Sequence, residues 1–254
     1  MTPDVKQMLS FYNSPLGRRT RKLLLKQVKI LSSDISNKRV LGIGFSTPYL
    51  RFALEKAERV TAVLPARMGV YAWPKNEANK TVLCDPLEMP FCDSSIDLII
   101  AVHSFEYISD SEEFMRELWR IAAPNANLVV IVPRRHGLWA QRDNTPLGFG
   151  HPFSRSQLDN LLRNHSFVPQ VWSDALYLAP SNSPLLLKSA HIFEQIGRFL
   201  GATFASAMCV SAQKQLFPAI PRRKKRQRLV RMPVLKPQTA IELPAIELSK
   251  IKIK

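Results

Sequence analysis

The sequence predicts an α/β domain built on a seven-stranded, mostly parallel sheet with helices on both faces. Short apolar runs alternate with amphipathic segments along residues 1–217, and this alternation is typical of parallel strands joined by helical crossovers. The length agrees, because a chain of 254 residues can bury the core of one ordinary α/β domain and still leave a tail. We therefore expect one domain over residues 1–217 and a separate segment over residues 218–254.

Seven strands are expected where apolar runs are bounded by turn-forming or charged residues. They lie at residues 39–44, 59–63, 81–84, 96–102, 127–132, 167–172 and 205–212. Two of the helices between them begin at capping boxes, Ser109 to Glu112 and Ser154 to Gln157, in which a serine and a residue three positions later satisfy free amide groups. Further helices are expected at residues 16–31, 49–56 and 184–200.

The basic charge of the chain is unevenly distributed. Residues 218–254 hold eleven Lys/Arg and two Asp/Glu, so +9 of the formal net charge of +16 lies in this segment. The segment is interrupted by prolines and has no helical stripe, so it cannot bury enough apolar area to offset its ordering entropy. We expect a disordered tail, for which RNA or another polyanion is a candidate partner and a solubilising extension is the alternative.

The cysteines and the apolar runs favour a cytoplasmic protein. Cys84, Cys92 and Cys209 have no metal-ligand spacing, and we interpret them as buried free thiols in a reducing compartment. No apolar run is long enough to span a bilayer, and the first residues do not form a signal peptide.

Residues that carry chemistry are expected at the carboxyl ends of the strands, where open parallel sheets bind their ligands. The first turn of this kind contains Gly42, Gly44 and Ser46. The two glycines let the backbone approach a ligand, and the serine offers a hydroxyl. A glycine pair also ends many strands that bind nothing, so this turn alone does not identify a ligand.

An ordered set of motifs spans residues 38–133. It comprises Val82-Leu-Cys-Asp85, Leu87-Glu-Met-Pro-Phe91, Ser95-Ile-Asp97, Val102-His-Ser-Phe-Glu106 and Glu117-Leu-Trp-Arg120. This set resembles the class I methyltransferases of the type 11 group, which bind S-adenosylmethionine (SAM) on a Rossmann-like sheet. The resemblance implies methyl transfer from SAM to an acceptor that remains open, a small molecule or RNA.

The resemblance also implies roles for single residues. Asp85 matches the carboxylate that accepts a hydrogen bond from the adenine amine, and a cap of its own turn is the alternative. Leu87 would lie near the adenine. His103 matches the position that lines the methionine side of the pocket and faces the methyl group, where an imidazole could act as a base. A purely local hydrogen bond is the alternative for His103, and the same two roles remain open for Glu106.

Two departures from the family pattern lie in the first turn and at the end of the second strand. The first turn has Gly42 in place of an acid, and Ser46 and Pro48 in place of glycines. The second strand ends at Leu64 and Pro65 instead of the acid that takes the ribose hydroxyls, so an acid introduced at Leu64 is expected to strengthen SAM binding. These departures favour an alternative function, a catalytically degenerate methyltransferase fold that serves as a binding or scaffold module with a nucleic-acid-binding tail.

Cations and aromatic residues gather in residues 133–153, after the fifth strand. Arg134, His136, Trp139 and His151 are the candidate substrate-binding residues, because this mixture suits an anionic, planar or nucleotide-like acceptor. A solvated loop with a buried tryptophan is the alternative. No metal site is expected, since methyl transfer requires in-line positioning rather than a metal.

Overall fold

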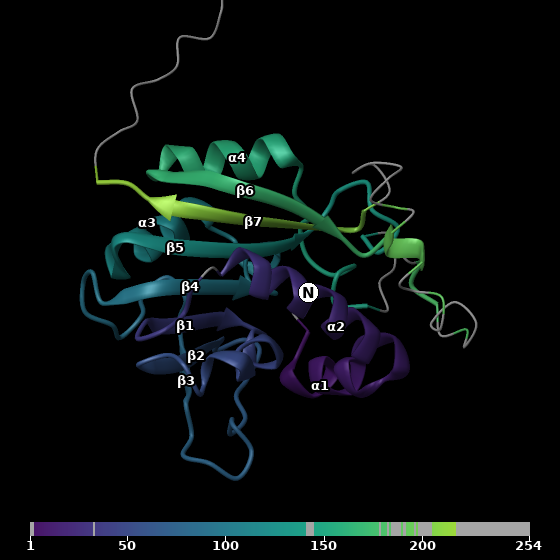
Figure 1. Cartoon of the computed structure of the whole chain (residues 1–254), viewed down its shortest axis with the longest axis horizontal. Coiled ribbons are helices and arrows are strands. Elements are labelled where there is room, and N and C mark those ends of the chain that lie inside the picture. Colours follow the sequence, from purple (N-terminus) through teal and green to yellow (C-terminus); the bar gives the residue numbers. More distant parts are fainter. Residues whose placement is uncertain are drawn as a thin grey trace, which may run out of the picture. The chain divides into compact units, whose positions relative to one another are not determined.

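The computed structural model describes residues 3–32, 34–140, 145–177, 179–181, 183, 189, 192–195, 197 and 205–216. Within them, the strands are β1 (Arg39–Gly44), β2 (Arg59–Pro65), β3 (Thr81–Cys84), β4 (Ile96–Val102), β5 (Ala122–Pro133), β6 (Phe167–Ala175) and β7 (Ala207–Lys214). They form one sheet in the order β3-β2-β1-β4-β5-β7-β6 (Figure 1), in which β7 runs antiparallel to both of its neighbours, β5 and β6. The predicted seven-stranded, mostly parallel sheet is confirmed.

Helices cover both faces of the sheet. They are α1 (Val5–Asn13), α2 (Pro15–Leu31), α3 (Ser111–Ile121) and α4 (Arg155–Asn164). The core has two parts, one on each face of the sheet. Ile100 and Val102 of β4 belong to the part with α1 and α2. Ile99 and Ala101 belong to the part with α3 and α4. Side chains alternate across a strand, so a strand covered on both faces is apolar on both, as β4 is over residues 98–102, beyond Asp97 near its start.

The first two helices are joined through a single residue. Asp4 and Gln7 form a capping box at the start of α1, in which each side chain accepts a hydrogen bond from the other residue's backbone amide. Ser14 ends α1 and caps α2 by accepting a hydrogen bond from the amide of Gly17 at 3.0 Å. The structure confirms the helix predicted over residues 16–31, whereas α1 was not among the predicted elements.

The helix predicted over residues 49–56 is wrong. This segment forms two short 3-10 turns, η1 (Thr47–Tyr49) and η2 (Arg51–Ala53). Pro48 supplies no amide hydrogen, and the available amides make tighter bonds to carbonyls three residues earlier, such as Leu50 to Thr47 at 3.3 Å. The compact turn keeps the chain close to the end of β1.

Two further expectations need correction. The helix α3 is capped by Asp110, whose carboxylate accepts a hydrogen bond from the amide of Glu113 at 2.9 Å, rather than by Ser109. Cys92 is exposed, so the interpretation of all three cysteines as buried thiols is wrong. The capping box at Ser154 is confirmed as the start of α4.

Two predicted segments extend beyond the described residues. Only part of the helix predicted over residues 184–200 is described, and the tail predicted over residues 218–254 lies entirely outside. The 3-10 turn η3 (Phe105–Tyr107) follows β4 after His103 and Ser104. Within the described part of the chain, no helix is both long and apolar enough to cross a membrane.

Lys214 fixes the end of β7 to α3. Its side chain is 1% exposed, and its Nζ donates to the carbonyl oxygens of Trp119 and Ala122, each at 2.7 Å. Carbonyl oxygens at a helix C-terminus have no partner within the helix, and a cation beside them is favourable. Burial lowers the pKa of the Lys214 ammonium.

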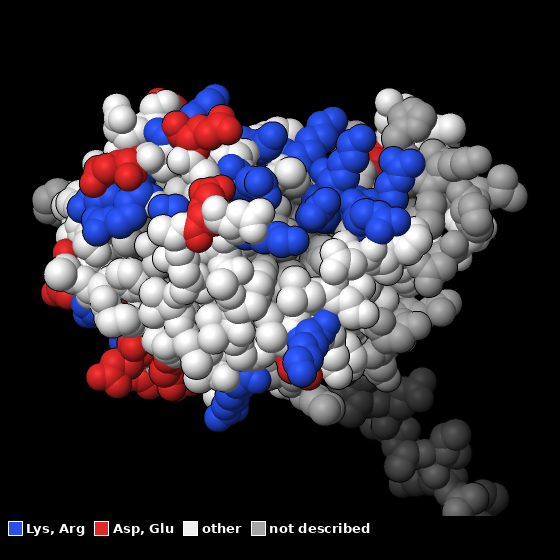
Figure 2. Space-filling model, turned by 90° about the horizontal axis from the view of Figure 1, so that it is seen from below, with Lys and Arg blue, Asp and Glu red and all other residues white. Residues whose placement is uncertain are grey.

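Exposed cations line the outer face of α2. Arg18, Lys22, Lys26 and Lys29 are exposed on a helix that has no acidic residue, and their spacing places them on one stripe. Figure 2 shows Lys and Arg side chains gathered on one side of the molecule, with few Asp or Glu among them. The basic surface of the chain is therefore not confined to residues 218–254.

Candidate cofactor and acceptor site

A cavity of about 170 Å³ lies at the carboxyl ends of β2, β3 and β4, and we call it the Asp85 cavity. It is lined by Pro65, Ala66, Arg67, Asp85, Pro86, Leu87, Ser104, Tyr107, Ile108 and Ser109. The structure thus brings together two of the predicted cofactor residues, Asp85 and Leu87, at the edge of the sheet where a ligand was expected.

Asp85 caps its turn and also lines the cavity. Its Oδ1 accepts a hydrogen bond from the amide of Leu87 at 2.9 Å, which was the alternative interpretation of this residue. The side chain is exposed, and it borders the cavity together with Leu87. A carboxylate accepts several hydrogen bonds, so a bond within the turn leaves it able to accept another from a ligand.

Leu64 lies in the core and not on the wall of the Asp85 cavity. Its side chain is fully buried in the cluster with α1 and α2. Beyond the end of β2, the amide of Ala66 donates to the carbonyl oxygen of Cys84 at 3.2 Å, so the exposed Ala66 is level with the start of the Asp85 turn. Pro65 and Ala66, the two residues after Leu64, both line the cavity, and Ala66 is the exposed one of the two.

The two glycines of the first turn let the chain pack against itself. A Cβ atom at Gly42 would overlap Ser46 Oγ and the Leu50 side chain, and one at Gly44 would overlap the carbonyl oxygen of His103. Gly44 also has a φ of +76°, which favours glycine. In this structure the atoms that approach both glycines belong to the protein itself.

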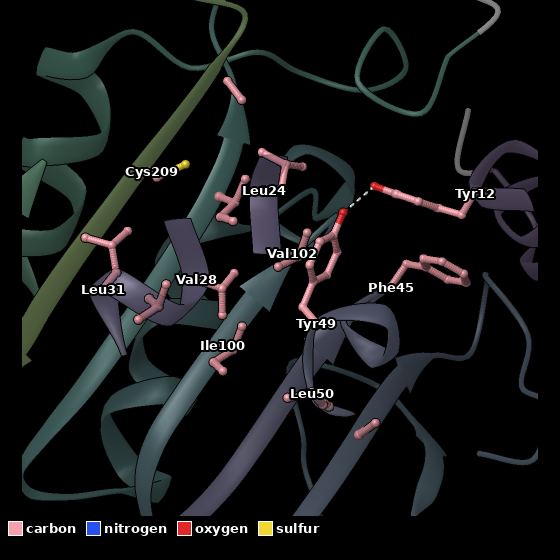
Figure 3. Close-up of a cluster of buried hydrophobic side chains, with 14 of the residues drawn as sticks. Tyr12, Leu24, Val28, Leu31, Phe45, Tyr49, Leu50, Ile100, Val102 and Cys209 are labelled. Carbon is pink, nitrogen blue, oxygen red and sulfur yellow. Dashed lines mark hydrogen bonds between the residues drawn. The ribbon is translucent and has the colours of Figure 1, made fainter. Parts of the chain in front are cut away.

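Aromatic side chains cover this turn (Figure 3). The rings of Tyr12 and Phe45 stack with centroids 5.4 Å apart and an interplanar angle of 17°, and the edge of Tyr49 packs against Tyr12 at 6.1 Å. Tyr12 is 3% exposed, and the other two rings have no exposed surface. We call these three residues, Tyr12, Phe45 and Tyr49, the aromatic plug.

Hydrogen bonds connect the aromatic plug to His103. The Tyr49 hydroxyl donates to the Tyr12 hydroxyl at 2.8 Å, which lies 2.6 Å from His103 Nε2. His103 Nδ1 lies 3.1 Å from Glu106 Oε1. The Tyr12 hydroxyl accepts from Tyr49 and has its own hydrogen left for His103, so Nε2 accepts from Tyr12 and Nδ1–H donates to Glu106. Burial raises the pKa of Tyr12 and of Tyr49, which keeps both phenols protonated.

Three buried polar atoms near this edge have no hydrogen-bond partner among the described residues. They are Ser46 Oγ, Ser104 Oγ and Glu106 Oε2. Leaving such a group unpaired costs about 1–3 kcal/mol, and proteins rarely leave buried polar groups unsatisfied. Their position around the turn after β1 and the end of β4 is suited to a polar ligand.

The four predicted substrate-binding residues do not converge on one site. Arg134 forms an ion pair with Asp174 at 2.5 Å, and Trp139 is fully buried. His136 and His151 are both exposed, but only His151 lines a groove of about 380 Å³ beside α4. Interpretation of this loop as a single acceptor pocket is therefore not supported by the arrangement of its side chains.

A larger cavity, of about 570 Å³, opens on the outer side of α1, and we call it the α1 cavity. It is lined by Lys6, Gln7, Ser10, Phe11, Ser14, Leu16, Thr145 and Pro180. The Phe11 ring lies 6.3 Å from Trp139 and 5.1 Å from Tyr12. Phe11 therefore connects the wall of this cavity to the aromatic plug.

Sequence comparisons agree with the motif set. Residues 30–130 match the family described as Methyltransferase domain. Tocopherol O-methyltransferase of Arabidopsis thaliana is 27% identical over 179 residues, which are 66% of this chain and 48% of that protein. Ajmaline N-methyltransferase of Rauvolfia serpentina is 38% identical over 47 residues, 18% of this chain and 16% of that protein. The chain thus spans about half or less of these curated relatives.

The fold comparison extends over most of the described domain. A SAM-dependent methyltransferase from Thermotoga maritima, described as a possible histamine N-methyltransferase, superposes with a TM-score of 0.59 over 83% of this chain and 96% of that chain, at 16% identity. This likeness, together with the sheet order, shows that the chain has the Rossmann-like fold of class I methyltransferases. The match of residues 30–130 to the Methyltransferase domain family covers the part of this fold that holds β1 to β4 and most of β5.

Several residues of the site were not predicted from the sequence. Tyr12 lies on a helix that was not predicted, although the capping box of Asp4 and Gln7 marks its start. Phe45 directly follows Gly44, and Tyr49 follows Pro48 in the same turn; these two aromatic residues beside the glycines were the available signal for their packing. The structure also brings Glu106 against His103, which a spacing of three residues after a strand does not reveal.

Proposed function

We propose that this chain transfers a methyl group from SAM to a small organic acceptor. One observation carries the proposal: Asp85 and Leu87 line a cavity at the carboxyl edge of a class I methyltransferase sheet. The Asp85 carboxylate is an acceptor for the adenine amine, and apolar side chains such as Leu87 and Ile108 suit the faces of the base.

The residues fit the nucleoside part of SAM better than its amino-acid part. The Asp85 cavity measures about 170 Å³, which is below the roughly 300–1,000 Å³ of pockets that enclose drug-sized ligands. Next to it, Tyr12 and Phe45 cover the turn after β1 and the ring of His103. The unpaired hydroxyl of Ser46 and carboxylate oxygen of Glu106 nevertheless supply polar groups of the kind that a zwitterionic amino-acid end requires.

His103 is the candidate base of the site. When bound, SAM supplies the methyl group, and a hydroxyl or amine that accepts a methyl group releases a proton. Glu106 holds His103 Nδ1 at 3.1 Å and thereby fixes the tautomer in which Nε2 carries the lone pair. In the described arrangement this lone pair accepts a hydrogen bond from Tyr12. Glu106 therefore acts as a positioning residue for His103.

A small organic acceptor is favoured over RNA by two observations. The relatives with curated names are methyltransferases of tocopherol and of ajmaline, which are small organic molecules. The α1 cavity measures about 570 Å³, within the usual size range of small-molecule pockets, about 300–1,000 Å³. Its lining combines Phe11 and Leu16 with Lys6 and Gln7, which suits an amphipathic acceptor.

The aromatic plug favours a second candidate function, a methyltransferase fold that binds a partner without catalysis. Its rings fill the turn where glycines are usual, and they leave the amino-acid end of the site closed. Calorimetry with SAM and S-adenosylhomocysteine separates the two functions. Micromolar binding of either compound, with release of S-adenosylhomocysteine in the presence of phenols or amines, is expected of the enzyme. Absence of binding to the folded chain supports the second function.

The proposal also covers the compartment of the protein and the partner of its tail. The free thiols of Cys84, Cys92 and Cys209 support a reducing, cytoplasmic compartment. The charge of residues 218–254 supports RNA or another polyanion as a partner of the tail, independently of the methyl acceptor.

A further inference from the structure

We propose that Tyr12 determines which adenosine compounds the site accepts. With Tyr12 against His103, the Asp85 cavity admits an adenine nucleoside, and SAM binds in full only after Tyr12 has moved away. This inference rests on the proposed function, because it assumes that the Asp85 cavity receives the nucleoside of SAM. It adds a residue outside the methyltransferase motifs that selects between ligands with and without an amino-acid chain.

Tyr12 makes three contacts that close the amino-acid end. Its ring stacks on Phe45 at 5.4 Å, its hydroxyl accepts from Tyr49 at 2.8 Å, and the same hydroxyl lies 2.6 Å from His103 Nε2. Tyr12 and His103 are 91 positions apart in the sequence, and both are almost fully buried. One side chain therefore covers both the turn after β1 and the candidate base.

The contacts that hold α1 in place are local, so the helix can move away without disturbing the sheet. The helix has nine residues, and only Met8 and Tyr12 among them are buried. A backbone hydrogen bond from Val5 to Met68 at 2.8 Å holds its start, and the extended residue Ser14 joins its end to α2. A rotation about Ser14 would move Tyr12 out of the site without breaking any strand pairing, and local openings of this kind cost less than global unfolding.

The groups beneath Tyr12 suit the amino-acid end of SAM. The hydroxyls of Ser46 and Tyr49 are donors for a carboxylate, and the free oxygen of Glu106 is an acceptor for an ammonium group. Ser46 Oγ and Glu106 Oε2 are buried and without partners. Bound SAM would therefore gain hydrogen bonds that the protein leaves unmade, in exchange for the contacts of Tyr12. Adenosine has neither the carboxylate nor the ammonium, so it has no means to displace Tyr12.

Calorimetry with two ligands, the unaltered chain and three variants tests this inference. Adenosine and SAM are titrated into the full chain and into the variants Tyr12→Phe, Tyr12→Ala and Leu9→Ala, the last of which changes a partly buried residue of α1 outside the plug. We expect adenosine to bind all four within a factor of about two. SAM affinity is expected to rise about tenfold or more in Tyr12→Ala and about fivefold in Tyr12→Phe, because a closed state lowers apparent affinity in proportion to its population.

The outcomes distinguish this inference from the proposed function. If adenosine and SAM both bind and SAM affinity is equal or lower in the Tyr12 variants, the role of Tyr12 is refuted and the proposed function stands. If neither compound binds any folded chain, both are refuted. Hydrogen exchange of the unaltered chain gives a second test that needs no variant. SAM is expected to speed exchange of the amides of residues 5–13 and adenosine to leave it unchanged, and unchanged exchange with SAM bound would also refute the role of Tyr12.

Discussion

The two ends of the site are built in different ways. The Asp85 cavity is lined by residues that directly follow β2, β3 and β4, and its main polar side chain, Asp85, is exposed. The other end is closed by the aromatic plug, whose members come from α1 and from the turn after β1. The open end depends on the order of the strands, whereas the closed end depends on a helix that precedes the sheet.

This difference shows what the altered glycine turn has become. Where the family pattern has further glycines, this chain has Ser46 and Pro48, and the neighbouring Phe45 and Tyr49 are fully buried. In this chain the turn is packed with aromatic rings. The closed end therefore depends on buried aromatic surface and the open end on an exposed carboxylate, so the two ends should respond differently to substitution.

The largest effect is expected at the end of β2, where two neighbouring positions face different environments. Leu64→Asp places a carboxylate in the core without a partner and should destabilise the fold by about 3 kcal/mol or more. Ala66→Asp places the same carboxylate on the exposed wall of the Asp85 cavity and should strengthen SAM binding about fivefold through one added hydrogen bond. Urea denaturation and calorimetry measure the two effects. A stable Leu64→Asp variant with tighter SAM binding would contradict the assignment of Leu64 to the core.

A smaller loss of stability is expected at the closed end. Gly44→Ala combines a positive φ with overlap of the His103 carbonyl oxygen, and it should destabilise the fold by about 2 kcal/mol or more. Gly69→Ala is the matched control, because its φ is +85° but the added Cβ would meet only Val5 at 3.6 Å. It should cost about 1 kcal/mol from backbone strain alone. Equal midpoints of thermal unfolding for the two variants would show that the close approach to β4 is unimportant.

At the open end, Asp85→Ala tests recognition of the adenine. The variant should fold, since Asp85 is exposed, and it should lose about 1–3 kcal/mol of SAM binding, or roughly 5- to 150-fold in affinity. Glu88→Ala, an exposed acid of the same loop that does not line the cavity, is the control and should bind SAM normally. Unchanged SAM affinity in a folded Asp85→Ala variant would show that the Asp85 carboxylate only caps its own turn through the Leu87 amide.

The smallest effect on SAM is expected from the tail. Replacing the five cations of residues 222–226 by glutamine should change SAM affinity by less than a factor of about two. It should weaken RNA binding and reduce the slope of log affinity against log salt, because fewer counterions are released. Fluorescence anisotropy across a salt series measures both. RNA binding with an unchanged slope would leave the tail without this role and direct attention to Arg18, Lys22, Lys26 and Lys29 on α2.

The sequence predicted the sheet and the open end of the site because both depend on local patterns. Apolar runs marked every strand, and the ordered motifs located Asp85 and Leu87 at the sheet edge, where the structure also has them. The closed end was not predictable in this way. Its contacts join Tyr12 to His103 across 91 positions, and no sequence pattern around either residue indicates that the two are in contact. Leu64 was placed incorrectly because a shift of one residue at a strand end turns a side chain to the other face.

The burial of Lys214 gives this chain an internal reporter of unfolding. Amine-reactive reagents reach exposed lysines such as Lys22 and Lys26 in the native state, whereas the Lys214 amine is enclosed between two carbonyl oxygens and the Trp119 ring. Acylation of Lys214 therefore requires β7 to separate from α3, an opening that costs much of the global stability. Mass spectrometry of Lys214 relative to Lys22 would follow loss of the central sheet without any engineered probe.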